Sequence, residues 1–201
     1  MTRSPRLAGC ILLLLLLPIA GAHAQSFPAQ LSAAAIERTQ HSVLYDGSYR
    51  VIAYPMGDVP ADRGVCADEI IRAYRSLGID LQQLVHEDMA RHFAAYPKLW
   101  GLPGPDRNID HRRVPNLERF FTRHGQTLAA TRDPADYHPG DLVTWRLGGT
   151  LPHIGIVTDR RNTDDTRPLI VHNVGQGPQL EDVLFAFPLF GHYRYDGPSN
   201  G

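Results

Sequence analysis

Two kinds of periodicity divide this chain, and their order restricts the folds open to it. Most apolar side chains between residues 33 and 125 recur at helical spacing, whereas from Tyr137 onward short apolar runs alternate with turns. The strand-like runs cover residues 142–145, 153–158, 169–174 and 191–195. No helical pattern connects these runs, and parallel neighbours would need such crossovers, so we expect an antiparallel sheet. The order predicts an α+β fold with N-terminal helices packed on an antiparallel sheet.

Four helices and one early strand are expected ahead of this sheet. Helical spacing and capping residues place the helices at residues 33–39, 66–77, 81–96 and 115–124. Residues 49–54 have the composition of a strand. A loop rich in proline and glycine then leads from that strand to residue 66.

The first 24 residues have the pattern of a secretory signal peptide. Arg3 and Arg6 precede an apolar core at residues 11–17, and Ala22-His23-Ala24 has the small residues of a cleavage site. The apolar core is too short to span a bilayer. We therefore expect a periplasmic or secreted protein with no membrane span after cleavage, folded as a single domain over residues 25–201.

The charge balance argues against one class of partner. Without Arg3 and Arg6 the chain has 18 basic and 21 acidic side chains, so the mature protein is weakly acidic. It has no basic tract and no interleaving of basic with aromatic residues. We expect no nucleic-acid partner.

The cysteine content of the chain indicates one position at which a reactive thiol is expected. Of two cysteines, Cys10 lies in the signal segment, so Cys66 is alone in the mature chain and cannot form an internal disulfide. A free thiol is a liability in an oxidising compartment. A small buried hydrophobe is the ordinary interpretation of a lone cysteine. Export and the position of Cys66 at a helix start favour a nucleophile, because the free N–H groups there stabilise a thiolate and an oxyanion.

Two histidines in the predicted strands complete a candidate catalytic triad. His153 is the expected general base and acid, and His172 is expected to orient it. Asn173 competes for the orienting role, although its side chain should point to the opposite face from His172. Either histidine taken singly is explained by burial in a hydrogen-bonded core. The Cys66 N–H would contribute to the oxyanion hole.

The order of these motifs resembles that of the papain-like NlpC/P60-type cell-wall peptidases. Tyr54 stands twelve residues before Cys66, and residues 139–143, 153–157 and 171–172 follow in family order. The resemblance implies a circularly permuted papain-like fold that cuts an amide in peptidoglycan stem peptides with a Cys-His-His triad and no metal or cofactor. It also implies that Tyr54 is the active-site tyrosine.

At finer grain the chain resembles an uncharacterised family of exported bacterial proteins, the YijF-like family with domain of unknown function 1287. The motifs that carry this resemblance span nearly the whole mature chain and lie at residues 64–68, 86–89, 109–117, 172–175 and 191–195. This family implies little about the substrate.

The residues around the cysteine depart from the peptidase pattern. The peptidases usually carry Asp-Cys-Ser-Gly, whereas this chain has Val65-Cys66-Ala67-Asp68. A carboxylate at Asp68 would oppose ionisation of the thiol and select a cationic or amine-bearing substrate. The expected substrate-binding or oxyanion residues are Tyr54, Ala67, Asp68, Asn173, Asp110 and His111. Taken alone, Asp110 and His111 are better explained as residues of a solvated loop, and the length of that loop without regular structure is compatible with a binding role.

Three functions therefore remain open for the sequence. The first is a cysteine hydrolase acting on a peptidoglycan peptide or another amide substrate. The second is a non-catalytic cell-envelope binding protein that retains the papain-like fold. The third is a hydrolase with a metal held by Cys66, His153 and His172. The resemblance and the helix-start position favour the first, with no metal and no cofactor.

Overall fold

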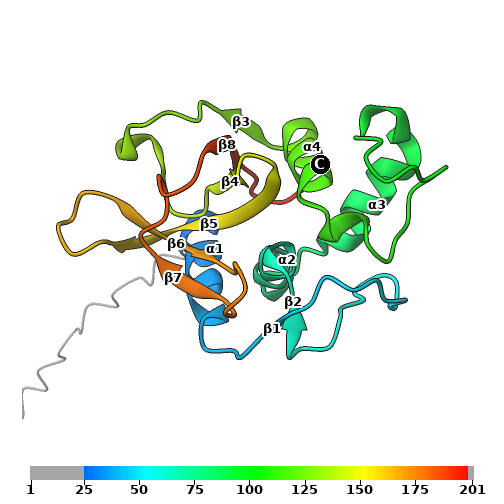
Figure 1. Cartoon of the computed structure of the whole chain (residues 1–201), viewed down its shortest axis with the longest axis horizontal. Helices are drawn as coiled ribbons and strands as arrows, with labels where there is room; N and C mark the ends of the chain where they lie inside the picture. The colour runs from blue at the N-terminus through cyan, green and yellow to red at the C-terminus, as the bar shows by residue number, and fades with distance from the viewer. Residues whose placement is uncertain (1–24, 199–201) are drawn as a thin grey trace, which may run out of the picture.

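The computed structural model describes residues 25–198 (Figure 1). The expected signal peptide, with its cleavage site and Cys10, lies outside this range. Within residues 25–198 no helix has the length and apolar character needed to cross a membrane.

Six strands form one sheet in the order β3-β8-β4-β5-β6-β7, and every neighbouring pair is antiparallel. The strands are β3 (Gln126–Leu128), β4 (Leu142–Leu147), β5 (Leu151–Arg161), β6 (Pro168–His172), β7 (Gln179–Glu181) and β8 (Leu189–Arg194). The predicted antiparallel sheet and the α+β class are confirmed. Strands β3 and β7 were not expected, because each has three residues and is too short to show an alternating pattern.

Four α-helices precede or border the sheet. They are α1 (Phe27–Arg38), α2 (Cys66–Ser76), α3 (Leu81–His92) and α4 (Val114–His124). Three short 3-10 turns, Phe93–Ala95, Asp110–Arg112 and Pro134–Asp136, join the regular elements. Helix α1 starts six residues earlier than expected, with Pro28 in its first turn, where a proline lacks no needed hydrogen bond.

The strand expected at residues 49–54 is wrong. This segment has no regular structure, Val51 is largely exposed, and the Ile52 amide bonds the Asn108 side chain instead of a neighbouring strand. The pairing made in this region is β1 (Leu44–Tyr45) with β2 (Arg63–Gly64), which run parallel. A strand-like composition forms a strand only where a partner strand is within reach.

Side chains of the sheet alternate between two apolar clusters. Leu142, Ile154 and Ile156 pack with Cys66, Ile70 and other residues of the helices. Val143, Trp145, Val157 and Ile170 form a second cluster with Leu184 on the other face. Each fully buried side chain of this size stabilises the fold by about 1.5–3 kcal/mol. Helices α1, α2 and α4 therefore lie against the sheet, whereas α3 packs on α2 and α4 (Figure 1).

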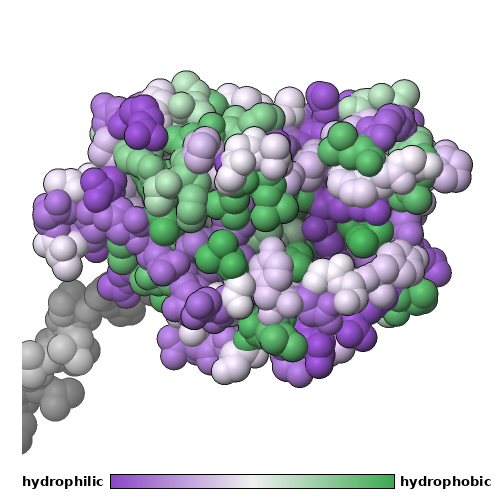
Figure 2. Space-filling view, viewed as in Figure 1, coloured by the Kyte–Doolittle hydropathy of each residue, from purple (hydrophilic) through white to green (hydrophobic). Residues whose placement is uncertain are grey.

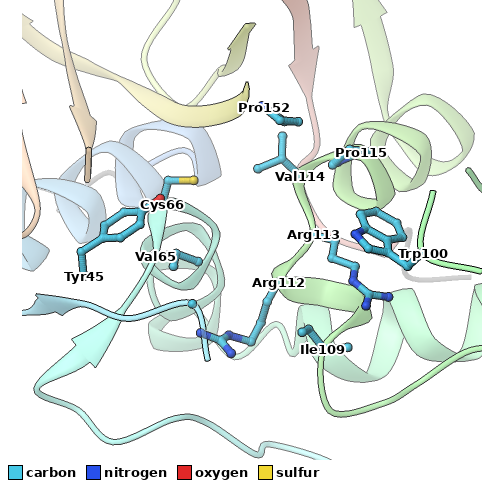
Figure 3. Close-up of a pocket in the computed structure, with 11 residues that line it drawn as sticks. Tyr45, Val65, Cys66, Trp100, Ile109, Arg112, Arg113, Val114, Pro115 and Pro152 are labelled. Atoms are coloured by element: carbon cyan, nitrogen blue, oxygen red, sulfur yellow. The ribbon is translucent and has the colours of Figure 1, made fainter. Parts of the chain in front are cut away.

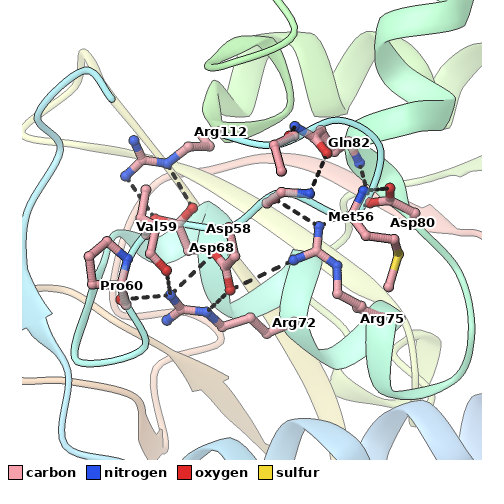
Figure 4. Close-up of polar contacts among 12 residues, drawn as sticks. Met56, Asp58, Val59, Pro60, Asp68, Arg72, Arg75, Asp80, Gln82 and Arg112 are labelled. Carbon is pink, nitrogen blue, oxygen red and sulfur yellow. Dashed lines mark hydrogen bonds and ion pairs between the residues drawn. The ribbon is translucent and has the colours of Figure 1, made fainter. Parts of the chain in front are cut away.

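A polar network fixes the loop that leads to Cys66 (Figure 4). Arg72 of α2 donates to Asp58 at 2.9 Å and to the carbonyl of Arg63 at 2.8 Å. The Met56 amide donates to Asp80 at 2.6 Å. Charged hydrogen bonds of this kind are about twice as strong as neutral ones, so the approach to α2 is held in one conformation.

Candidate functional site

Cys66 is the first residue of α2, as predicted. The Asp68 carboxylate, in the first turn, accepts a hydrogen bond from the Val65 amide at 2.6 Å and so caps the helix. The parallel pairing of Tyr45 with Gly64 brings a second segment alongside this turn. The sequence thus places the thiol at a helix N-terminus, where backbone N–H groups are available to it.

A cavity of about 340 Å³ opens at the thiol. Cys66, Tyr45 and Val65 lie at one end, and Trp100 and Arg113 lie at the other (Figure 3). Figure 2 shows a hollow on this face between α2 and α4, with hydrophobic side chains in it and hydrophilic ones beside it. A cavity of this size accommodates a small peptide segment.

The Cys66 thiol is buried, with 4% of the residue exposed. Burial raises the pKa of the thiol to about 11, and hydrogen bonding from the Ile154 amide, the Tyr45 hydroxyl and the Ala67 amide opposes that rise. The charge of Asp68 adds to it. At rest the group is therefore a protonated thiol surrounded by three hydrogen-bond donors.

The tyrosine beside the thiol is Tyr45, and the assignment of that position to Tyr54 is corrected. Tyr45 lines the cavity and hydrogen-bonds Cys66, and burial followed by the thiolate charge raises the pKa of its hydroxyl. The Tyr54 ring instead packs edge-on against His86, with ring centroids 5.2 Å apart, and lies under Arg107. Sequence spacing contains no signal for Tyr45, because its position depends on the short parallel pair β1–β2.

His153 and His172 are brought together as predicted. The Nε2 atom of His153 lies 2.9 Å from the Nδ1 atom of His172. The Nε2 atom of His172 lies 2.8 Å from a carboxylate oxygen of Glu181 in β7. Burial, then the neighbouring His172, lowers the pKa of His153 to about 3. Burial lowers the pKa of His172 as well, and Glu181 opposes that shift. The sequence analysis missed Glu181 because it missed β7.

The Cys66 sulfur and this histidine pair lie on opposite faces of the sheet at the start of β5. Within residues 25–198 no hydrogen bond joins the sulfur to either imidazole, and the His153 ring packs near Trp145 at 5.6 Å on the second face. The backbone amide of Ile154, the residue that follows His153, nevertheless lies close enough to the sulfur to lower the pKa of the thiol. Pro152, the residue before His153, lines the cavity. The thiol therefore lies within one residue of the backbone that carries the imidazole.

Asp68 and Ala67, which follow Cys66 in α2, have different roles near the thiol. The Asp68 carboxylate is buried and accepts two hydrogen bonds from Arg112, at 2.8 and 3.0 Å. This pairing neutralises the charge that the sequence suggested would select a cationic substrate, and Asp68 does not line the cavity. Ala67 contributes its amide to the thiol.

The remaining candidates, Asp110, His111 and Asn173, are buried and do not line this cavity. Burial raises the pKa of Asp110 to about 6, although it accepts hydrogen bonds from the Asp106 amide and from Arg113. Burial, then the charge of Arg112, lowers the pKa of His111 to about 3. Asn173 accepts a hydrogen bond from the Gly175 amide at 3.0 Å. The solvated-loop interpretation of Asp110 and His111 is wrong, because both side chains are core residues.

Among residues 25–198, no three histidine, cysteine or acidic side chains are grouped as a metal site would require. Cys66 and the two histidines lie around different sides of β5. The metal-site hydrolase therefore has no ligand set in the described part of the chain.

Residues 32–195 match the family described as "Domain of unknown function (DUF1287)". The chain is also similar to the "Uncharacterized protein YijF" of Escherichia coli (strain K12), with 56% identity over 154 residues, which cover 77% of this chain and 75% of that protein. The matched region includes every residue of the candidate site.

Proposed function

We propose that this chain, which belongs to the family described as domain of unknown function DUF1287, is an exported cysteine hydrolase that cleaves an amide bond. The observation that carries the proposal is the approach of the Cys66 sulfur to the backbone amide of Ile154, next to His153, whose imidazole is held by His172 and Glu181. The thiol opens into the cavity in which a substrate would lie.

Hydrogen bonds link His153 to His172 and His172 to Glu181. The Glu181 carboxylate determines which nitrogen of each imidazole carries a proton. An ionised Glu181 only accepts, so Nε2 of His172 carries the proton. In the neutral ring Nδ1 of His172 then accepts, and Nε2 of His153 must donate to it. The lone pair of His153 is left on Nδ1. A neutral imidazole with a free nitrogen is the form that a general base requires.

The reaction follows from these roles. The step requires the start of β5 to turn so that the His153 ring moves from the second face of the sheet into the cavity. The Cys66 sulfur then attacks the amide carbonyl while its proton passes to Nδ1 of His153. His153 then gives the proton to the leaving amine, and water hydrolyses the thioester. The N–H groups at the start of α2 stabilise the oxyanion. The exposed residues Gly148 and Gly149 precede β5 at positive φ and allow its start to adjust.

The finer fold assignment is part of the same proposal. A cysteine at the start of a helix, packed on an antiparallel sheet whose central strand carries His153, supports a circularly permuted papain-like fold of the NlpC/P60 type. The resemblance of the motif order to cell-wall peptidases supports a peptidoglycan stem peptide as the substrate and the periplasm or the exterior as the location.

Digestion of purified peptidoglycan tests the proposal. The intact protein should release soluble muropeptides that mass spectrometry identifies, and Cys66→Ala and His153→Ala should release none. His41→Ala is the matched control, because His41 is exposed and its side chain contacts the exposed Glu37. Equal product release by Cys66→Ala and the intact protein would refute a nucleophilic role for the thiol.

A non-catalytic envelope-binding protein is the second candidate. It is favoured by the raised pKa of the buried Cys66 thiol and by the absence of a thiol–imidazole hydrogen bond within residues 25–198. The two functions differ in thiol chemistry. A hydrolase should react covalently with an electrophilic peptide at a rate that falls in His153→Ala, whereas a binding protein should react slowly and equally with and without His153.

A further inference from the structure

The end of the cavity remote from Cys66 is cationic. Arg113 and Trp100 line that end, whereas the Arg112 guanidinium lies on the Val65 side and bonds Asp68 (Figure 3). No acidic side chain is among the residues that line the cavity. The stretch between the two ends is apolar, formed in part by Val114, Pro115 and Pro152 (Figure 3). A ligand that reaches from the thiol to the far end therefore crosses an apolar channel and meets positive charge.

The two arginines differ in how many of their N–H donors remain free to bind a ligand. Arg112 bonds both carboxylate oxygens of Asp68 and also the carbonyls of Ser48 and Asp46, so its guanidinium is occupied by the fold. Arg113 has one hydrogen-bond acceptor within residues 25–198, Asp110, which its Nη1 atom contacts at 3.2 Å. A guanidinium has five N–H donors. Arg113 is therefore the cation available to a ligand.

Stacking and partial burial hold the Arg113 guanidinium where it can bind a ligand. Its guanidinium carbon lies 4.1 Å from the centroid of the Trp100 ring, and 14% of its side chain is exposed. Stacking on an aromatic ring leaves the edge of a guanidinium free, and partial burial strengthens its interaction with an anion. Trp100 is itself partly exposed and lines the same cavity.

We propose that this cavity binds a peptide that carries a carboxylate, which Arg113 holds while Trp100 packs against the neighbouring part of the ligand. The carboxylate and the guanidinium have matching planar geometry and form paired hydrogen bonds. Because the Asp110 carboxylate already pairs with Arg113 at 3.2 Å, the positive charge left for a ligand is small, which favours a singly charged carboxylate over a doubly charged phosphate. The position of this carboxylate relative to a cleaved amide rests on the proposed function, since Cys66 defines the other end of the cavity.

Binding to the uncleaving variant Cys66→Ala tests the inference apart from catalysis. The probes are acetyl-alanyl-alanine with a free carboxylate and the same peptide as its carboxamide. Nuclear magnetic resonance of the tryptophan indole N–H groups reports the site, because Trp100 lines the cavity and Trp145 is buried in the second cluster. The carboxylate should bind about ten-fold more tightly than the carboxamide and shift the Trp100 signal.

Variants of Arg113 decide the assignment. Arg113→Gln in the Cys66→Ala background should remove the preference for the carboxylate, and Arg113→Lys should retain part of it, because the charge stays and the planar fork is lost. Arg160→Gln is the control, since Arg160 is exposed near the far end of β5. Native-like spectra verify the fold of each variant.

The outcomes separate this inference from the proposed function. Equal affinity for the two probes, binding of neither, or a preference that survives in Arg113→Gln would overturn the carboxylate site even if the intact protein cleaves peptidoglycan. A preference that depends on Arg113 would support the site even if the intact protein cleaves nothing, in which case the hydrolase alone is wrong.

Discussion

At the scale of single residues, the environment of Cys66 is set by groups that the sequence does not place near it. Cys66, His153 and His172 could be chosen from the sequence, because export, helix-start position and strand pattern are local signals. Tyr45 and Glu181 could not, because each reaches the site through a pairing of very short strands, β1 with β2 and β6 with β7.

Replacing Tyr45 tests the surroundings of the thiol. The Tyr45 hydroxyl lowers the pKa of Cys66 against the larger effect of burial, so Tyr45→Phe should raise that pKa further. Alkylation of Cys66 by iodoacetamide at pH 8 should slow several-fold, because the thiolate is the reactive form. Tyr54→Phe is the matched control and should leave the rate unchanged. A slower rate in Tyr54→Phe alone would restore Tyr54 to the site.

Replacing Glu181 tests the proton arrangement of the two imidazoles. In Glu181→Gln the amide can donate to Nε2 of His172, which removes the constraint that leaves Nδ1 of His153 free. We expect nitrogen chemical shifts to report a changed tautomer of His153, and any hydrolytic turnover to fall on the order of 10²-fold. Glu37→Gln, which alters an exposed residue bonded to His41, should change neither. An unaltered His153 tautomer in Glu181→Gln would contradict the relay.

At the scale of elements, helix α2 is anchored by the buried pair of Asp68 and Arg112. The sequence showed the helix and its first residue, since helical spacing and the acidic first turn are local features. It did not show that the acid serves the fold, because Arg112 lies 44 residues away along the chain. A contact of that separation has no periodic signature in the sequence.

Removing the acid from this pair should be costly. Asp68→Ala deletes the helix cap and leaves the Arg112 guanidinium buried without its carboxylate, so we expect a loss of about 3–5 kcal/mol in the free energy of unfolding. Urea denaturation measures it. Asp62→Ala, at an exposed residue four positions before Cys66, should change the free energy by less than about 0.5 kcal/mol. Similar losses in the two variants would show that the pair contributes little.

At the scale of the whole molecule, the fold class and the antiparallel sheet follow from the order of helical and strand patterns, whereas the cavity does not. Its lining comes from α2, from the loop that carries Trp100, from the start of α4 and from Pro152 at the start of β5. Local patterns place each of these elements but not their relative positions, because packing between distant segments sets those. The finer papain-like assignment therefore stays a prediction.

Buried histidines should make the stability of the whole protein depend on pH. His111 and His153 have folded-state pKa values lowered to about 3, so the fold favours their neutral forms. Their contribution is present above the unfolded pKa of about 6.5 and is lost as the pH falls below it, by about 2 kcal/mol for each at pH 5. Asp110 acts in the opposite sense, because its raised pKa favours the protonated acid in the fold as the pH falls through about 6. The two histidines outweigh it.

Urea unfolding at pH 7.5 and pH 5.0 measures this dependence. The free energy of unfolding should be lower at pH 5.0, and the difference should shrink in His111→Asn, which cannot take up a proton. His41→Asn replaces an exposed histidine and should leave the difference unchanged. Equal stability at the two pH values would show that His111 and His153 do not resist protonation in the fold.

The two ends of the cavity are formed by separate stretches of the chain, so the residues at one end can be changed separately from those at the other. The thiol end is built by residues 45–66, whereas Trp100 and Arg113 lie on the connection between α3 and α4. Exchange of residues 97–113 between members of the family that keep Arg112, which pairs with Asp68 in α2, would therefore alter ligand choice with little change at the thiol. Members of the family can diverge in the same way. Under the proposed function, residues 45–66 would be conserved for reactivity, and residues 97–113 could change with the ligand.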